Sequence, residues 1–330
     1  MTVFPFFLRG RLHAALLAVA CLALPLAAQA EDVVQTCAAT GRVERPRFTV
    51  DVSGQGPDVL LIPGMATPGQ VWDDTRDALK DHYRVHVVSL RGFGPGSARC
   101  NADGPVLEPV MQGLADYITE CHIERPAVVG HSIGGMLALM LAARHPALPG
   151  RVVSVDGAPF IGPLMTPPME SVEAMAPMVA QMRAGLAQMA SAPRPQVPEG
   201  PATDPGEKSQ AGSQSNTARG RTLVVGWVRR IDMRVFGQAM VDAMQTDLRA
   251  EFAAITVPVD LIFAQDDRHK PMEEQRAEWV TQYRGAADFR ATAVPGSYHF
   301  VMLDQPEAFH AALVEALDRP AASAGHKRGN

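Results

Sequence analysis

Apolar runs of strand length alternate with stretches of helical length along most of the chain. The strand-like runs are RFTVDVSG (47–54), DVLLIPG (58–64), RVHVVSL (84–90), RPAVVG (125–130), RVVSVDG (151–157), VPVDLIFA (257–264) and FRATAVPG (289–296). Most are continuously apolar, which is typical of parallel strands buried on both faces. Helical patterns lie between several of them, for example over 106–122 and 133–145. The alternation predicts an α/β fold with a mostly parallel central sheet flanked by helices.

One long segment interrupts this alternation. The break in the alternation over residues 158–256 predicts an inserted helical cap. This cap divides the core into residues 31–157 and 257–318. Residues 191–220 are rich in Pro, Gly, Ser and charge, so we expect a flexible link there. Residues 319–330 are expected to form a disordered tail. The first part of the cap is rich in methionine, suited either to lining an adaptable acyl pocket or to packing helices together: Met165, Met169, Met175, Met178, Met182 and Met189.

The N-terminus has the pattern of an export signal. Arg9 and Arg11 precede an apolar run that ends in Ala28-Gln29-Ala30. This pattern predicts cleavage near Ala30 and a periplasmic or secreted protein. A membrane anchor is the alternative, but the run is short and is broken by Pro25. A lipoprotein signal at Cys21 fits less well, and no second apolar stretch is long enough to span a membrane.

Charge and cysteine content narrow the possible partners. Beyond Ala30 the chain has 28 Lys and Arg against 35 Asp and Glu, a net charge of −7, and no basic stripe, so nucleic acid is not an expected partner. No His or Cys spacing predicts a metal site, and no phosphate-binding loop occurs, so no cofactor is expected. Three cysteines remain, allowing one disulfide. We favour Cys37–Cys100, because Cys100 and Cys121 flank a predicted helix.

The strongest chemical motif is Gly130-His131-Ser132-Ile133-Gly134. It lies between a strand-like run and an apolar helical run. A serine on such a tight strand-to-helix turn is a nucleophile elbow, which needs small residues two positions before and two after it. Ser132 is therefore the candidate nucleophile, with a helix-capping serine as the structural alternative.

A serine hydroxyl needs a base. His299 follows the last predicted strand and precedes the last helix, where loops at the carboxyl edge of a sheet carry active-site residues. His269, on a neighbouring loop, is the competitor. His131 is too close to Ser132 in sequence for its ring to turn back onto the hydroxyl.

The base in turn needs a carboxylate to orient it. Asp266 and Asp267 follow the strand-like run that ends at Ala264, and the usual spacing of three residues favours Asp267. Asp156, after the strand-like run 151–157, is the other strand-end carboxylate that could serve. For the oxyanion we expect the backbone N–H groups of Met65, after the turn at Gly64, and Ile133.

Taken together, these segments resemble the α/β-hydrolase superfamily. LLIPG, SLRGFGPGS, VVGHSIGGMLAL, LIFAQDD and GSYHFVMLDQPEAF are similar to its successive landmarks, over about residues 48–317. The order Ser132, Asp267, His299 is that of the superfamily, although Ala264 stands where glycine is more usual. The serine at the elbow differs from haloalkane dehalogenases and epoxide hydrolases, which attack with an aspartate.

The resemblance implies an exported serine hydrolase that cleaves a carboxylic ester or lactone through an acyl-enzyme, without cofactor or metal. The expected substrate is small and apolar. An iminopeptidase-like peptidase, with Glu170 or Glu173 receiving an amino terminus, is an alternative. A cofactor-free perhydrolase or dioxygenase and a non-catalytic binding protein also remain open. The sequence does not predict the oligomeric state.

Overall fold

The computed structural model describes residues 37–94, 96–190, 200–266 and 270–320. The predicted export signal and Asp267 lie outside these residues, as do 191–199 of the predicted link and nearly all of the predicted tail.

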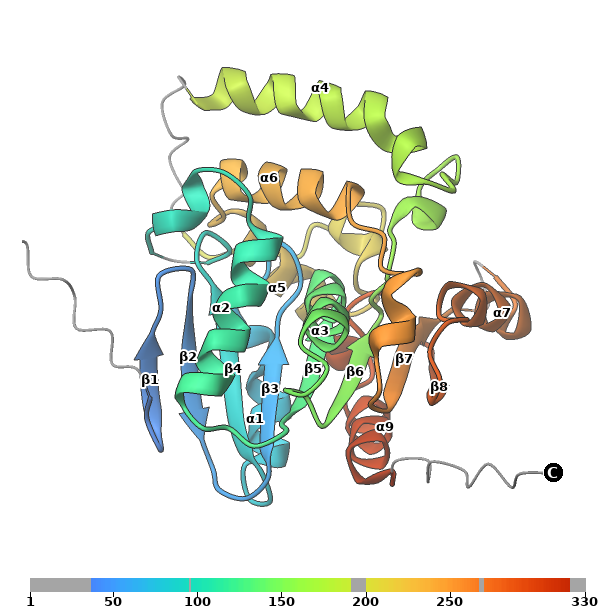
Figure 1. The fold of residues 1–330 in the computed structure, drawn as a ribbon. Helices are drawn as coiled ribbons and strands as arrows, with labels where there is room; N and C mark the ends of the chain where they lie inside the picture. Colours follow the sequence, from blue (N-terminus) through green and yellow to red (C-terminus); the bar gives the residue numbers. More distant parts are fainter. Residues whose placement is uncertain (1–36, 95, 191–199, 267–269, 321–330) are drawn as a thin grey trace, which may run out of the picture. The chain divides into compact units, whose positions relative to one another are not determined.

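An eight-stranded sheet forms the centre of the fold, in the order β1-β2-β4-β3-β5-β6-β7-β8 (Figure 1). β2 pairs antiparallel with β1 and β4, and every other pairing is parallel. This confirms the predicted mostly parallel sheet and adds one short edge strand, β1, that the apolar pattern did not predict. The strands are β1 (Gly41–Glu44), β2 (Phe48–Ser53), β3 (Asp58–Ile62), β4 (Arg84–Leu90), β5 (Ala127–His131), β6 (Arg151–Val155), β7 (Val259–Gln265) and β8 (Phe289–Pro295).

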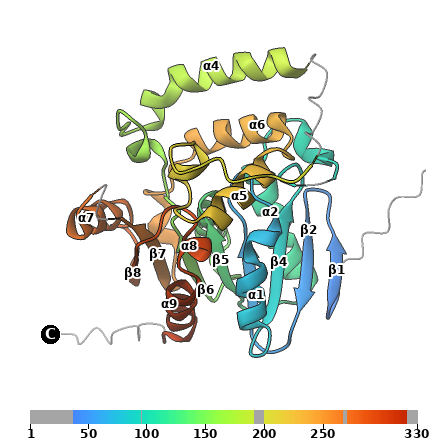
Figure 2. The same cartoon turned by 180° about the vertical axis from the view of Figure 1, so that it is seen from behind.

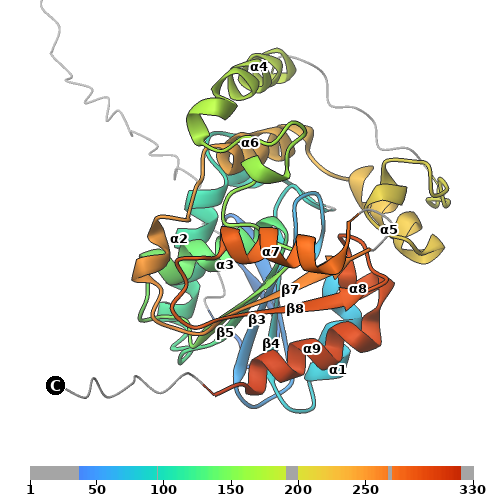
Figure 3. The ribbon, with the colours of Figure 1, turned by 90° about the vertical axis from the view of Figure 1, so that its right-hand side faces the viewer.

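Helices cover both faces of the sheet (Figure 3). One face packs against α2 (Leu107–Glu120), α3 (Ile133–Arg144) and α7 (Met272–Gln282), and the other against α1 (Asp73–Leu79), α8 (Val301–Asp304) and α9 (Pro306–Asp318). The two faces carry separate buried apolar clusters, so the parallel strands are buried on both sides, as their continuous apolar runs predict. Short 3-10 helices are η1 (Gly69–Trp72), η2 (Arg99–Ala102), η3 (Gly162–Leu164), η4 (Ala211–Ser213) and η5 (Glu251–Ala254).

The inserted segment contains α4 (Val172–Ala190), α5 (Ala218–Val228) and α6 (Met233–Met244). α4 lies along α6, beyond the sheet, in both Figure 1 and Figure 2. Its methionines serve mainly that helix pairing, because Met175, Met178 and Met182 pack with Val241 and Met244. None of the six methionines singled out in the sequence lines the two cavities at Ser132 described below. Helix packing, rather than lining the cavities at Ser132, is thus the role of Met175, Met178 and Met182.

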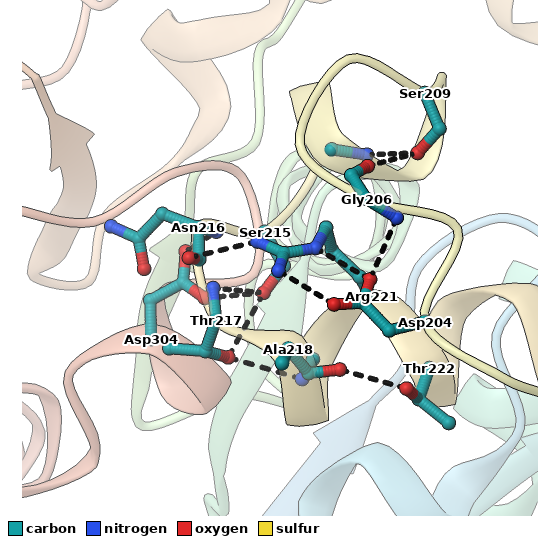
Figure 4. Close-up of polar contacts among 12 residues, drawn as sticks. Asp204, Gly206, Ser209, Ser215, Asn216, Thr217, Ala218, Arg221, Thr222 and Asp304 are labelled. Atoms are coloured by element: carbon teal, nitrogen blue, oxygen red, sulfur yellow. Dashed lines mark hydrogen bonds and ion pairs between the residues drawn. The ribbon is translucent and has the colours of Figure 1, made fainter.

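Residues 200–220 are not the flexible link that their composition indicates. The buried Arg221 guanidinium donates two hydrogen bonds to Asp204, at 2.7 and 2.8 Å, and Ser215 is fully buried (Figure 4). The Ser215 hydroxyl donates to the Asp304 carboxylate at 2.5 Å. Polar contacts of this kind hold the segment in place of the missing apolar side chains, which is why an argument from hydrophobicity alone gives the wrong expectation here.

A disulfide joins Cys37 to Cys121, with a Cα–Cα distance of 5.3 Å, and Cys100 is free and exposed. The expected Cys37–Cys100 pair is therefore wrong, and the topology explains why. Cys37 precedes β1 and Cys121 follows α2, so both lie at the edge where the parallel strands begin. Cys100 follows β4, at the opposite edge.

The disulfide predicts a specific stability effect. Replacing Cys37 and Cys121 together with serine should lower the free energy of unfolding by about 4.5 kcal/mol, because the bond closes a loop with a sequence separation of 84. Urea unfolding followed by circular dichroism measures this loss. Cys100→Ser is the control and should leave the urea midpoint unchanged. Equal midpoints for all three proteins would contradict the assigned pairing.

Candidate active site

Ser132 lies in a strained turn between β5 and α3. Its backbone angles are φ 54° and ψ −119°, in a region that residues with a Cβ rarely adopt. Its amide donates to the carbonyl of Val155 in β6 at 2.8 Å, which fixes the turn to the neighbouring strand. The turn holds the serine just beyond the carboxyl end of a central strand, in the geometry of a nucleophile elbow.

Close backbone contacts explain the two glycines around the serine. A Cβ on Gly130 would lie 2.0 Å from the Gly134 carbonyl oxygen, and one on Gly134 would lie 2.4 Å from the Ile62 carbonyl oxygen. No side chain fits at either position without moving the backbone. The motif requires small residues at these positions because the backbones of β5, α3 and the end of β3 lie in close contact there.

His299 lies in the loop between β8 and α8. Its Nδ1 is 2.7 Å from Oδ2 of Asp156. An ionised carboxylate only accepts hydrogen bonds, so Nδ1 is the protonated nitrogen, and Nε2 keeps the lone pair that a base needs. The side chain of His299 is 29% exposed and that of Asp156 is 12% exposed, so the carboxylate is mostly buried while the imidazole remains accessible.

Asp156, directly after β6, is the carboxylate that the structure brings to His299. Its Oδ1 accepts a hydrogen bond from the amide of Ala264 at 2.9 Å, so both carboxylate oxygens are engaged. We expected Asp267 in this role and Asp156 as the alternative; Asp267 lies outside the described residues. β6 and β7 are neighbours and end at the same edge, so an acid after either strand can approach His299. Among the described residues, Asp156 is the carboxylate positioned to orient His299.

Two cavities meet at Ser132. The larger, of about 640 Å³, is lined by Ser132 and His299 together with apolar side chains of the cap, among them Val225, Trp227 and Phe236. The smaller, of about 330 Å³, is also lined by Ser132 and His299 and extends toward Ile161 and Trp279. Met65 and Met240 line both. A molecule bound at the serine can therefore extend in two directions.

The predicted oxyanion residues lie beside the serine. Met65 and Ile133 line the smaller cavity together with Ser132 and His299. Ile133 is the first residue of α3, and the first N–H groups of a helix have no carbonyl partner within it. The turn before Met65 lies against the elbow, because a Cβ on Gly64 would be 3.3 Å from the Cβ of Ser132. The structure thus brings both predicted oxyanion residues to the serine.

The backbone on both sides of His299 is held by hydrogen bonds. The amide of Tyr298 donates to Asp304 at 2.9 Å, and the amide of Phe300 donates to the carbonyl of Gln214 at 3.0 Å. Asp304 is the same carboxylate that accepts from Ser215 (Figure 4). One buried group therefore joins the histidine loop to the inserted segment. Burial raises the pKa of Asp304 above its ordinary value, against the opposing effect of hydrogen bonds from Ser215, Asn216 and Thr217.

His131 is a residue that the sequence argument set aside. It ends β5, is 1% exposed, and its Nε2 lies 2.9 Å from the backbone carbonyl oxygen of His299. The two imidazole rings have centroids 4.5 Å apart. A contact across 168 positions has no local sequence signal, and only the position next to Ser132 could have suggested it.

Within the described residues, no group of three or more His, Cys, Asp or Glu side chains could hold a metal ion. No helix in the same part of the chain is long and apolar enough to cross a membrane.

A model of the alpha/beta hydrolase family matches residues 59–312. The chain belongs to the alpha/beta hydrolase family. The fold is shared with other hydrolases. The thermophilic esterase from Thermogutta terrifontis superposes with a TM-score of 0.64 at 21% identity, covering 84% of this chain and 98% of that one. The enol-lactonase from Burkholderia xenovorans superposes with a TM-score of 0.60 at 19% identity, covering 86% and 99%.

Sequence relatives in this alpha/beta hydrolase family match over a shorter stretch. A pimeloyl-[acyl-carrier protein] methyl ester esterase from Vibrio cholerae is 39% identical over 109 residues, 33% of this chain and 40% of the relative. A putative carbamate hydrolase, RutD, from Yersinia enterocolitica is 36% identical over 103 residues, 31% of this chain and 37% of the relative. The chain therefore spans about two fifths of the length of the curated relatives it matches.

The two candidate acids give opposite predictions. Asp156→Asn should lower kcat for ester hydrolysis by roughly 10⁴-fold, because the amide can hold His299 in the wrong tautomer. Asp267→Asn should change kcat little, because the Nδ1 proton of His299 is already accepted by Asp156. Steady-state kinetics on folded variants, checked by circular dichroism, measure both. The reverse ranking would return the orienting role to Asp267.

Proposed function

We propose that this member of the alpha/beta hydrolase family is an exported serine hydrolase that cleaves a carboxylic ester or a lactone. The observation that carries the proposal is the meeting of Ser132, on its strained elbow, with the His299–Asp156 pair at the smaller cavity. A strained serine, an oriented imidazole and a cavity occur together here, and acyl transfer by a serine nucleophile requires all three.

The proposed reaction has two steps. Ser132 Oγ attacks the carbonyl carbon while His299 Nε2 takes the hydroxyl proton, and the oxyanion that forms is held by the backbone N–H groups of Met65 and Ile133. The ester C–O bond then breaks as His299 returns the proton to the departing alkoxide, which leaves an acyl-serine. Water, deprotonated by His299, attacks the acyl-serine and releases the acid and the free serine.

The cavities support a substrate with apolar groups on both sides of the scissile bond. The larger cavity presents aromatic and aliphatic side chains from α5 and α6, and the smaller one presents Ile161, Leu164 and Trp279. Apolar walls with a few polar groups at the reacting centre are the usual composition of ligand sites. An ester bond at Ser132 would place its acyl and alcohol parts in different cavities.

The relatives support an ester substrate rather than a peptide. Their names describe a methyl ester esterase and, among structures of the same fold, an enol-lactonase and an esterase. Glu170 and Glu173, the residues considered for binding an amino terminus, line neither cavity at Ser132. The iminopeptidase-like alternative therefore has less support than the esterase.

Export remains part of the proposal. The N-terminal pattern over residues 1–30 motivates it, and the Cys37–Cys121 disulfide supports it, because such bonds persist in oxidising compartments. Mass spectrometry of the protein recovered from the periplasm or medium of an expressing bacterium tests it. The expected N-terminus is Glu31.

A fluorophosphonate probe tests the nucleophile without knowledge of the substrate. The wild-type protein should be labelled, whereas Ser132→Ala should lose labelling and at least about a thousandfold in ester turnover while keeping its circular dichroism spectrum. Ser213→Ala, an exposed serine of the inserted segment, is the matched control and should be labelled normally. Labelling that survives in the Ser132 variant would reject the assignment.

Because two cavities meet at Ser132, filling one of them should slow the hydrolysis of only some esters. Val225→Trp should fill part of the larger cavity and lower kcat/KM by about tenfold or more for esters lengthened on one side of the bond. Esters lengthened on the other side should be hydrolysed as by the wild type. Two series of aliphatic esters, one with growing acyl groups and one with growing alcohols, provide the measurement. An equal response of both series would argue against separate cavities for the two parts.

A further inference from the structure

His131 connects the strand that carries the nucleophile to the loop that carries the base. It is the last residue of β5, one position before Ser132, and is buried. Its Nε2 is 2.9 Å from the carbonyl oxygen of His299, and the ring centroids are 4.5 Å apart. The ring also packs against Phe300, at 4.9 Å between centroids. One side chain thus contacts the histidine loop through both a hydrogen bond and ring packing.

The hydrogen bond defines the protonation of His131. A carbonyl oxygen can only accept, so Nε2 carries the proton and donates. Burial, together with the nearby His299, lowers the pKa of His131 well below its ordinary value, so the ring is neutral and Nδ1 is unprotonated. Nδ1 faces the turn before the oxyanion residue Met65, because a Cβ on Gly64 would lie 2.7 Å from it. Nδ1 is buried and has no hydrogen-bond partner in the described part of the chain.

The hydrogen bond from His131 comes from a different part of the fold than the other hydrogen bonds that hold the histidine loop. The amides of Tyr298 and Phe300 are held by Asp304 and Gln214, which belong to the loop's own helix and to the inserted segment. His131 holds the residue between them, and it does so from the elbow itself. Only this bond joins the backbone of the base directly to the strand that positions Ser132, among the hydrogen bonds of the described residues.

We infer that His131 is a positioning residue, which keeps the His299 backbone in register with the Ser132 elbow by donating from its neutral imidazole. This inference rests on the proposed function. A misplacement of about 1 Å at reacting groups can cost on the order of 100-fold in rate, so one backbone tether between nucleophile and base has a measurable catalytic effect. Its neutrality matters too, because His299 becomes a cation when it accepts the serine proton, and a charged neighbour would oppose that step.

Two nearly isosteric substitutions separate the hydrogen bond from the shape of the side chain. Gln at position 131 can place an amide N–H where Nε2 of the imidazole lies, whereas Met fills similar space without a donor. We expect His131→Met to lower kcat for p-nitrophenyl butyrate by about tenfold or more, with KM within about twofold of wild type. His131→Gln should retain kcat within about threefold. The rate of fluorophosphonate labelling should follow the same order.

The outcomes distinguish positioning from a purely structural role. Equal kcat values for the Met and Gln variants, or a loss that appears only in KM, would overturn the inference. So would a loss of kcat that follows melting temperature rather than the presence of a donor. If the wild-type protein is neither labelled nor active, the proposed function fails; if it is labelled and active but the Met variant is as fast, only the role of His131 fails.

Nitrogen NMR of the wild-type protein, labelled with ¹⁵N-histidine, remains decisive where both variants fail to fold. The His131 ring, assigned through its contact with Phe300, should be neutral and protonated on Nε2 at neutral pH. If the assigned His131 ring is charged, or is protonated only on Nδ1, the inference is wrong.

Discussion

The backbone of Ser132 is the constraint on which the rest of this site depends. A non-glycine residue at φ 54° costs roughly 1–3 kcal/mol, and it persists only where the surroundings determine it. Here the surroundings are the hydrogen bond from the Ser132 amide to the Val155 carbonyl and the close packing of β5, α3 and the end of β3, which leaves no room for side chains at Gly130 and Gly134. The central sheet therefore positions the reactive hydroxyl more rigidly than a flexible loop could.

The order of the strands in the sheet brings Asp156 and the His299 loop close to Ser132. β5, β6 and β7 are adjacent, and β8 follows them, so the ends of four parallel strands bring Ser132, Asp156 and the His299 loop to one edge. The inserted segment closes the cavity above them and is joined to the histidine loop through Asp304. Cavity wall and catalytic loop consequently share hydrogen bonds, which makes the position of the cap relevant to the position of the base.

Much of this arrangement could be predicted from the sequence, because its signals are local. Continuous apolar runs indicate parallel strands, and the glycines around Ser132 indicate a tight turn. The position of His299 after the last strand indicates the loop that the structure brings to Asp156 and to the cavities at Ser132. The choice between Asp156 and Asp267 could not be made in this way, since both follow neighbouring strands that end at the same edge, and the apolar pattern does not say which carboxylate reaches His299. The role of His131, the order within residues 200–220 and the disulfide partner of Cys37 depend on contacts between distant segments, for which apolar patterning carries no signal.

The disulfide bears on the protein's resistance to proteolysis rather than on its catalytic activity. Cys37 and Cys121 lie at the edge of the sheet where the parallel strands begin, whereas Ser132 lies at the edge where they end. Reduction would release the chain before β1 and favour local opening there, without altering any bond of the elbow. A protease acts on the opened form, so we expect a reducing environment to shorten the lifetime of each molecule. The catalytic rate of each intact molecule depends instead on the site at Ser132, at the opposite edge of the sheet.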